Sequence, residues 1–323
     1  MTISRRNLLQ IPLATLPIVG TRHAWAQQYP TKPVRLIVGA SAGTTIDVTA
    51  RYVAEALSKR LNQSFVVDNR PGAGGAIGSD AVAKAPADGY NLGFAGITHF
   101  ASRYSSDATT GYDPVKDFTG IARICSAALA IVVPVDSPYR TLQSLIQAMK
   151  AKPGEIDYGS GGMGSTSHLC TVILNDLTQT KAKHIPYKGN TQAVTDTVAG
   201  IVAFTSQGSG GVLPLIKAGK LRALAVTSQR RWEALPDVPT GIEAGVAGFE
   251  VASWMGVLGP ASTPAPVAIL ISSEVARIAR SPEFKAFCDK QSMYVELVEH
   301  QQFQADLPRE DAHWKRVSQL TRA

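Results

Sequence analysis

Short strand-like runs alternate with helical patterns along most of this chain, and this rhythm limits the possible folds more than any other feature. Val34 to Val38 and Phe65 to Asp68 are rich in β-branched residues and flank the helical pattern Asp47 to Leu61. Such alternation is typical of a parallel α/β sheet. The rhythm returns with strands predicted at Ile156 to Tyr158, Lys183 to Ile185, Ile201 to Phe204 and Leu221 to Thr227, and with helices from about Ser167 and Gln192. The sequence therefore predicts two similar sheets.

Two apolar runs that end in prolines connect the predicted sheets. They are Ala128 to Val133 and Val251 to Leu258. A chain of this length favours two domains over one, and we interpret these two runs as paired hinge strands between them. The tail is predicted to return to the first domain with a helix at Pro266 to Arg280, a strand at Tyr294 to Leu297 and a helix at Gln301 to Leu320. The expected fold is α/β with two domains, each a doubly wound, mostly parallel sheet. Domain 1 comprises residues 27–131 and 257–323, and domain 2 comprises residues 132–256.

The N-terminus has the pattern of an export signal. Arg5 and Arg6 precede an apolar stretch, Leu8 to Val19, and the A-x-A site that ends at Ala26 follows. The stretch is shorter than the roughly 20 residues of a membrane helix and contains prolines, so it does not fit a membrane anchor. We predict that residues 1–26 are a signal peptide, cleaved after Ala26, and that the mature protein is periplasmic. The paired arginines favour the twin-arginine route, and an ordinary secretory signal stays open.

Charge and cysteine content argue against several classes of function. Cleavage removes three arginines and no acid, which lowers the net charge from +7 by three to +4. The remaining basic residues are scattered, so nucleic acid is a poor partner. Cys125, Cys170 and Cys288 lie far apart without a C-x-x-C pair, which argues against a metal site or a disulfide scaffold. We expect these cysteines to be buried, and we expect no metal or cofactor.

Two turns rich in Gly, Ser and Thr follow the first predicted strand of each domain and run into helices. They span Gly39 to Asp47 and Gly159 to His168. At a helix N-terminus, unpaired backbone N–H groups and the helix dipole form an anion site, and glycine lets a carboxylate approach closely. Two such turns facing across a cleft are predicted to clamp one anionic solute; a purely structural role as caps and tight turns is the alternative. The candidate ligand-binding residues are Ala40, Ser41, Gly43, Thr44, Thr45, Asp47, Gly161, Gly162, Gly164, Ser165, Thr166 and His168.

Two enzyme hypotheses compete for the same segments. The first turn satisfies G-x-S-x-G, which would make Ser41 the nucleophile of a serine hydrolase. It follows the first strand of the mature chain, however, and leaves no room for the earlier strands that such an enzyme needs. Gly159 to Gly164 satisfies G-x-G-x-x-G, the fingerprint of a dinucleotide-dependent oxidoreductase. The next predicted strand runs into Pro186 and lacks the acid that would hold a ribose, so binding without catalysis is favoured.

Several motifs, in order along nearly the whole mature chain, resemble the Bug family, the periplasmic binding components of tripartite tricarboxylate transporters. They are Tyr29 to Val38, Val66 to Gly75, Ala83 to Tyr90, Tyr112 to Phe118, Ile185 to Gly189, Ala218 to Thr227 and Leu235 to Thr240. The resemblance implies a type II periplasmic binding protein, or Venus flytrap, that closes on a small carboxylate and has no catalytic activity. It also implies membrane permease subunits as partners. We expect a monomer.

The resemblance adds two segments to the predicted site. Thr98 and His99 match a cleft-facing loop after a strand at Asn91 to Ala95. Ser206 and Gln207 lie in a further predicted loop that should face the far end of the ligand. This loop lacks the acidic residue usual in the family, so a mono-, di- or aromatic carboxylate is predicted rather than an amino acid.

Three other residues invite a functional role. Asp47 either contacts the ligand or only complements the dipole of the first helix. Arg70 could clamp a carboxylate in bidentate fashion, but we favour an internal ion pair and leave it out of the site. Trp254, in the second hinge strand, is predicted to pack between the domains.

Overall fold

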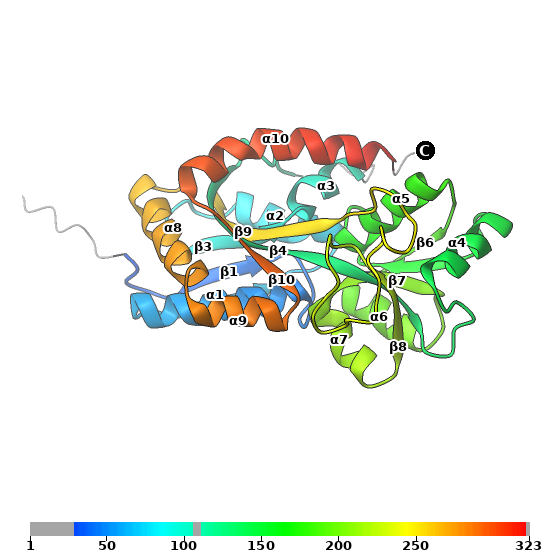
Figure 1. Cartoon of the computed structure of the whole chain (residues 1–323). Coiled ribbons are helices and arrows are strands. Elements are labelled where there is room, and N and C mark those ends of the chain that lie inside the picture. Colours follow the sequence, from blue (N-terminus) through cyan, green and yellow to red (C-terminus); the bar gives the residue numbers. More distant parts are fainter. Residues whose placement is uncertain (1–28, 106–110, 321–323) are drawn as a thin grey trace, which may run out of the picture.

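Two lobes lie side by side and are joined by strands that pass between them (Figure 1). The structure is a computed structural model that describes residues 29–105 and 111–320; the predicted signal peptide lies outside these ranges. Lobe 1 begins with β1 (Val34–Val38), α1 (Thr45–Leu61), β2 (Phe65–Asn69), η1 (Ala73–Gly75), α2 (Ala76–Ala83), β3 (Asn91–Gly96) and α3 (Thr98–Ser105). The long strand β4 (Phe118–Pro134) then leads into lobe 2.

Lobe 2 contains α4 (Leu142–Ala151), β5 (Asp157–Ser160), α5 (Thr166–Thr178), β6 (Lys183–Pro186), α6 (Asn190–Val198), β7 (Phe204–Gly208), α7 (Ser209–Lys217) and β8 (Leu221–Val226). The chain returns to lobe 1 through β9 (Ala252–Pro260), α8 (Ala265–Ala279), α9 (Pro282–Lys290), β10 (Met293–Val298) and α10 (His300–Gln319). The predicted return of the tail is confirmed, because β10 pairs with the lobe 1 part of β4.

Three parallel strands form the centre of lobe 1. β1 lies between β2 and β3, with Val34 opposite Phe65 and Leu36 opposite Leu92. Alternate residues of β1 point to opposite faces of the sheet. Leu36 packs in the core with α1, α8 and α9, whereas Ile37 packs in the core with α2, α3 and α10. Both faces of the strand are therefore buried, which explains its continuous apolar sequence.

Lobe 2 repeats this arrangement. β5 lies between β6 and β7, and all three strands are parallel, with Asp157 opposite Lys183 and Tyr158 opposite Phe204. The turns that follow β1 and β5 therefore leave equivalent strand ends, where ligands of open α/β sheets bind.

β4 and β9, which we call the linking strands, carry the chain between the lobes. The first part of β4 pairs with β9 and β10, and its last part pairs with β7 and β8 in lobe 2. β4 is longer than the predicted run from Ala128 and begins at Phe118. The apolar pattern did not reveal this first part because Gly120, Arg123 and Ser126 interrupt it, although all of its residues except Thr119 are buried.

Each lobe has its own core. Leu36, Phe94 and Cys288 lie in the core of lobe 1, whereas Tyr158 and Phe204 lie in that of lobe 2. The predicted α/β fold with two lobes is confirmed, with antiparallel linking strands added to the parallel centres. The boundaries at 131/132 and 256/257 stay a prediction. All three cysteines are buried, as expected.

Within residues 29–105 and 111–320, no helix is both long enough and apolar enough to cross a bilayer.

Candidate functional site

A cavity of about 250 Å³ lies between the lobes. Its walls include the first residues of α1 and α3 in lobe 1, of α5, α6 and α7 in lobe 2, and parts of both linking strands. Each helix start presents N–H groups that have no partner within their own helix, together with the positive end of the helix dipole. Five helix starts therefore converge on one cavity, and the arrangement favours an anion.

Ten of the sixteen predicted site residues line this cavity. They are Ala40, Ser41, Gly43, Thr44, Thr45, Thr98, Gly161, Ser165, Thr166 and Gln207. The other six, Asp47, His99, Gly162, Gly164, His168 and Ser206, lie outside the lining. In each of these six residues, the polar group expected to face a solute either forms a hydrogen bond within the protein or points away from the cavity.

Asp47 shapes the first turn instead of lining the cavity. Its side chain is buried and accepts hydrogen bonds from the Gly43 N–H at 2.9 Å, from Arg51 Nε at 3.1 Å and from Asn69 Nδ2 at 2.8 Å. Burial alone would raise the pKa of Asp47, but these bonds outweigh it and hold the pKa below its ordinary value. The structural role left open by the sequence is thus the one observed here.

The second turn uses its glycine N–H groups internally. The N–H of Gly161 donates to Ser167 Oγ at 3.2 Å, that of Gly162 to Ser160 Oγ at 3.1 Å, and that of Gly164 to His168 Nδ1 at 3.2 Å. The expectation that these three N–H groups face a solute is therefore wrong. The turn instead positions Ser165 and Thr166, which line the cavity at the start of α5.

Two neighbouring histidine rings lie against each other beside this turn. The ring centroids of His168 and His184 are 4.4 Å apart, and His184 Nε2 lies 2.6 Å from Ser160 Oγ. Burial lowers the pKa of His168 to about 3, helped by the neighbouring His184, and lowers that of His184 to about 4. Both rings are therefore neutral near pH 7, which leaves His168 Nδ1 free to accept the bond from Gly164.

The predicted loop at Thr98 and His99 is wrong, because these residues open α3. Thr98 lines the cavity, but His99 points into the core of lobe 1. Its ring nitrogens lie 3.2 Å from Ser79 Oγ and 2.9 Å from the Pro114 carbonyl oxygen. Burial lowers the pKa of His99 to about 4, and the ring packs against Phe118 at a centroid distance of 4.2 Å.

The predicted loop at Ser206 and Gln207 is also wrong, because these residues belong to β7. Adjacent residues of a strand point to opposite faces. Gln207 therefore lines the cavity, whereas Ser206 Oγ turns toward Thr171 Oγ1 at 3.3 Å. The strand predicted at Ile201 to Phe204 ends where β7 begins. The polar residues that follow do not show a strand pattern, because their hydroxyl groups find partners in the core, as when Thr205 Oγ1 donates to the Gly159 carbonyl oxygen at 2.7 Å.

Sequence reasoning missed three further parts of the lining. Two of them are the helix starts at Lys188 to Thr191 and at Gly208 to Gly211, and the third is the glycine-rich segment Pro71 to Gly75. The signal was available, because each combines glycine with a following helix, as the two predicted turns do. Arg70 is absent from the lining and pairs with Asp68 at 3.0 Å, in agreement with its predicted internal role.

Lys188 is the one charged residue in the lining, and it is exposed. The rest of the lining, taken over the described residues, consists of backbone, hydroxyl, amide and apolar groups. Histidine is absent from the lining formed by the described residues, so the cavity lacks the usual base of a serine nucleophile beside Ser41. The serine hydrolase alternative is not favoured.

The two lobes touch at the rim of the cavity. Thr191 Oγ1 of lobe 2 donates to the Ala42 carbonyl oxygen at 3.1 Å, and the Gly210 N–H donates to Thr45 Oγ1 at 3.0 Å. Glycine makes these approaches possible, because a Cβ on Gly189 would meet Ser41 and a Cβ on Gly74 would meet the backbone of Met163. The structure is thus a closed conformation, with the cavity sealed in part by contacts between lobes.

Comparison with known proteins identifies the family. Residues 49–321 match the model of the tripartite tricarboxylate transporter family receptor. The chain belongs to this receptor family. Among curated relatives of the receptor, protein BugT of Bordetella pertussis is 35% identical over 257 residues, which cover 79% of this chain and 79% of BugT. The family resemblance seen in the sequence is confirmed.

Solved structures agree with this assignment. The receptor superimposes on the periplasmic binding protein BugD with a TM-score of 0.84 and 29% identity, over 91% of this chain and 98% of BugD. It also superimposes on R. palustris Rpa4515 with adipate, with a TM-score of 0.85 and 34% identity, over 91% of this chain and 98% of that one. The family is one of periplasmic substrate-binding proteins, and the dinucleotide-dependent alternative is not favoured either.

Proposed function

We propose that this receptor captures a small carboxylate in the cavity between its lobes and delivers it to membrane permease subunits from the periplasm. The observation that carries the proposal is the convergence of five helix starts on one cavity that contains no acidic side chain. A carboxylate satisfies the N–H groups and the positive dipole ends there. The similarity to a structure that contains adipate supports the same class of solute.

The lining also bears on the kind of carboxylate. Aspartate and glutamate residues are absent from the lining across the described chain, so nothing there would neutralise the ammonium group of an amino acid. Asp47, which directly follows Ile46 of the lining, is held by protein donors. Apolar side chains such as Phe94, Leu129 and Met255 complete the walls. We therefore propose a mono-, di- or aromatic carboxylate with an uncharged body.

We further propose that the protein is exported, that its signal peptide is removed after Ala26, and that the mature receptor is a monomer. The ten lining residues predicted from the sequence are proposed as ligand contacts, together with Lys188 at the rim. A charged lysine there would attract an anionic solute and contact a second carboxylate.

Thermal unfolding of the mature protein against a panel of solutes tests this proposal. The panel contains adipate and other dicarboxylates, monocarboxylates, aromatic acids, amino acids, sugars and NAD. A solute that binds only the folded state stabilises it by about 2.7 kcal/mol at a hundredfold excess over its Kd. We expect a shift with one class of carboxylate and no turnover of that compound. A shift with NAD alone, or with sugars alone, would overturn the proposal.

A further inference from the structure

The C-terminal helix α10 lies along the linking strands (Figure 1). A groove of about 440 Å³ separates α10 from these strands. Because residues of a strand alternate between faces, neighbours on β9 serve different sites. Ser253 and Met255 line the cavity, whereas Trp254 between them lines the groove. The position of Trp254 therefore fixes two residues of the cavity wall.

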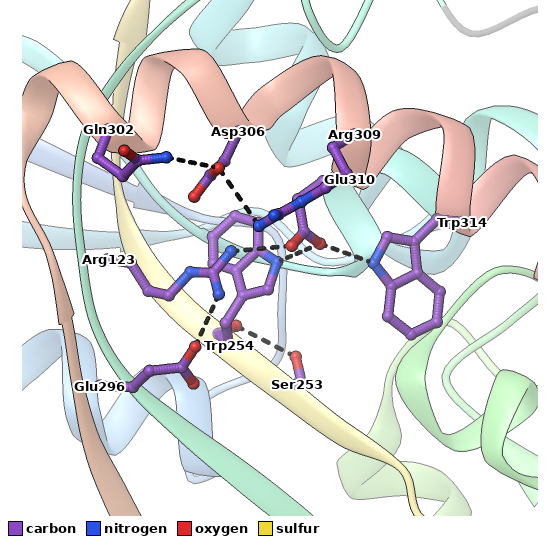
Figure 2. Close-up of polar contacts among 9 residues, drawn as sticks. All are labelled: Arg123, Ser253, Trp254, Glu296, Gln302, Asp306, Arg309, Glu310 and Trp314. Carbon is purple, nitrogen blue, oxygen red and sulfur yellow. Dashed lines mark hydrogen bonds and ion pairs between the residues drawn. The ribbon is translucent and has the colours of Figure 1, made fainter.

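Glu310 of α10 ties both linking strands to the helix. Figure 2 shows its carboxylate between the Arg123 guanidinium and two indole rings. Glu310 Oε1 lies 2.9 Å from Arg123 Nη2 on β4, and its Oε2 accepts from Nε1 of Trp254 on β9 and from Nε1 of Trp314, each at 3.1 Å. Arg123 is buried, with 9% of its side chain exposed, and also pairs with Glu296 at 2.7 Å.

Packing holds the ring of Trp254 in addition to the hydrogen bond at its Nε1. Its ring lies 5.2 Å from that of Phe303 on α10 and 6.1 Å from that of Phe100 on α3, and the Arg123 guanidinium lies 5.2 Å from its centroid. The prediction that Trp254 packs between domains needs correction, because these partners belong to lobe 1. One contribution comes from lobe 2, since Leu169 of α5 belongs to the same apolar cluster.

Leu169 connects this cluster to the ligand site. It lies one turn after Thr166, which lines the cavity at the start of α5. The cluster therefore contacts the lobe 2 helix whose N-terminus faces the solute, while Trp254 holds the lobe 1 strand that faces it. The cluster thus joins the strand that carries Ser253 and Met255 to the helix that begins at the cavity.

We propose that the hydrogen bond from Trp254 to Glu310 is a positioning contact for solute capture. It holds β9 against α10, keeps Ser253 and Met255 in the cavity wall and favours the closed conformation of the lobes. Trp254 and Glu310 are positioning residues, since neither lines the ligand cavity. The effect on affinity rests on the proposed function of the cavity, whereas the effect on lobe closure does not.

Two matched substitutions test the proposal. Trp254→Phe and Trp314→Phe each delete one indole N–H that donates to the same Glu310 oxygen, but only Trp254 lies on a strand that lines the cavity. Spin labels on Ile77→Cys in lobe 1 and Ile201→Cys in lobe 2, both exposed positions, report the lobe separation by pulsed electron resonance. Calorimetry with adipate, or with the carboxylate that gives the largest thermal shift, reports the Kd.

We expect Trp254→Phe to shift the ligand-free distances toward a more open population and to raise the Kd about fivefold or more, the scale of ordinary coupling between sites. Trp314→Phe should leave both readouts as in the parent protein. Equal effects of the two substitutions, or no effect of Trp254→Phe on the distances, would overturn the proposal. If no carboxylate binds the parent protein, the proposed function fails, and the ligand-free distances still decide this inference.

A second pair of variants covers the case in which Trp254→Phe does not fold. Glu310→Ala and Glu296→Ala each remove one carboxylate partner of Arg123, but only Glu310 reaches Trp254. The same labels and the same titration apply. A distance shift in Glu310→Ala alone supports the positioning role, and an identical shift in both variants contradicts it.

Discussion

Substitution of Gly189 by Ala should weaken solute binding while leaving the fold intact. Gly189 caps α6 with an extended backbone (φ −167°) that alanine also adopts. A methyl group built there would lie 1.9 Å from Ser41 Oγ in the opposite lobe. The clash exists only while the lobes are in contact at this point, so a separation of the lobes relieves it.

The size of the effect follows from this geometry. The serine oxygen must move by about 1 Å or more, and overpacking of this kind costs about 1–3 kcal/mol. At 1.4 kcal/mol per factor of ten, the Kd should rise about 5- to 150-fold. The local effects on stability are smaller and oppose each other. Alanine is a poorer N-cap than glycine, which destabilises the fold. It also lowers the entropy of the unfolded chain, which stabilises the fold by less than about 1 kcal/mol. The melting temperature without ligand should therefore change little.

A double-mutant cycle with Ser41→Ala provides the test. Calorimetry with the bound carboxylate gives the Kd for the parent, both single variants and the double variant. Ser41→Ala removes the oxygen that clashes, and the next contact, Ser41 Cβ, lies 3.3 Å from the added methyl. In that background Gly189→Ala should change the Kd by less than about twofold. An equally large effect in both backgrounds would refute closure against Ser41 as the cause.

Three further predictions follow from the site. Lys188→Ala should raise the Kd for a dicarboxylate several-fold at low salt and less at about 0.5 M salt, as exposed charges are screened; equal effects at both salt concentrations, measured by calorimetry, would contradict a charge contact. Asp47→Ala should lower the free energy of unfolding in urea by about 2 kcal/mol, because three donors lose their acceptor, and a loss near zero would argue against the turn-forming role. The unfolded chain protonates His168 and His184 near the ordinary pKa of about 6.5, whereas the folded chain resists to about 3 and about 4. Stability should therefore be complete above about pH 6.5 and fall as the pH drops toward 4, and urea unfolding of His184→Gln should show a shallower fall than the parent.

The sequence predicts the fold well where one physical rule dominates. β1 is an apolar run buried on both faces, and α8 shows a regular helical pattern, so both lie within one residue of their predicted bounds. Prediction from apolar patterns fails where polar side chains are buried together with apolar ones. β7 carries Thr205 and Gln207 into the core through side-chain hydrogen bonds, and β4 carries Arg123 there through two ion pairs. Neither kind of partner can be read from a single sequence.

The site, too, could be predicted only in part. The turns before α1 and α5 were predictable, because glycine, serine and threonine before a helix indicate an anion site. Which groups face the cavity was not predictable, since His99 and His168 satisfy local partners that only the folded chain brings near them. The start of α7 lines the cavity and contacts Thr45 of the other lobe, a proximity that only the folded chain creates.

The composition of the cavity lining has a consequence for how solute binding depends on pH. Histidine is the side chain whose charge ordinarily changes between pH 5 and 8, and it is absent from the lining of the described cavity, as are aspartate, glutamate, cysteine and tyrosine. The helix starts present the same partial positive charge at every pH in that range. If the solute is the proposed carboxylate, its own ionisation sets the pH dependence of binding in that range, because the helix starts attract the ionised form. The amount of solute bound would then follow its ionised fraction.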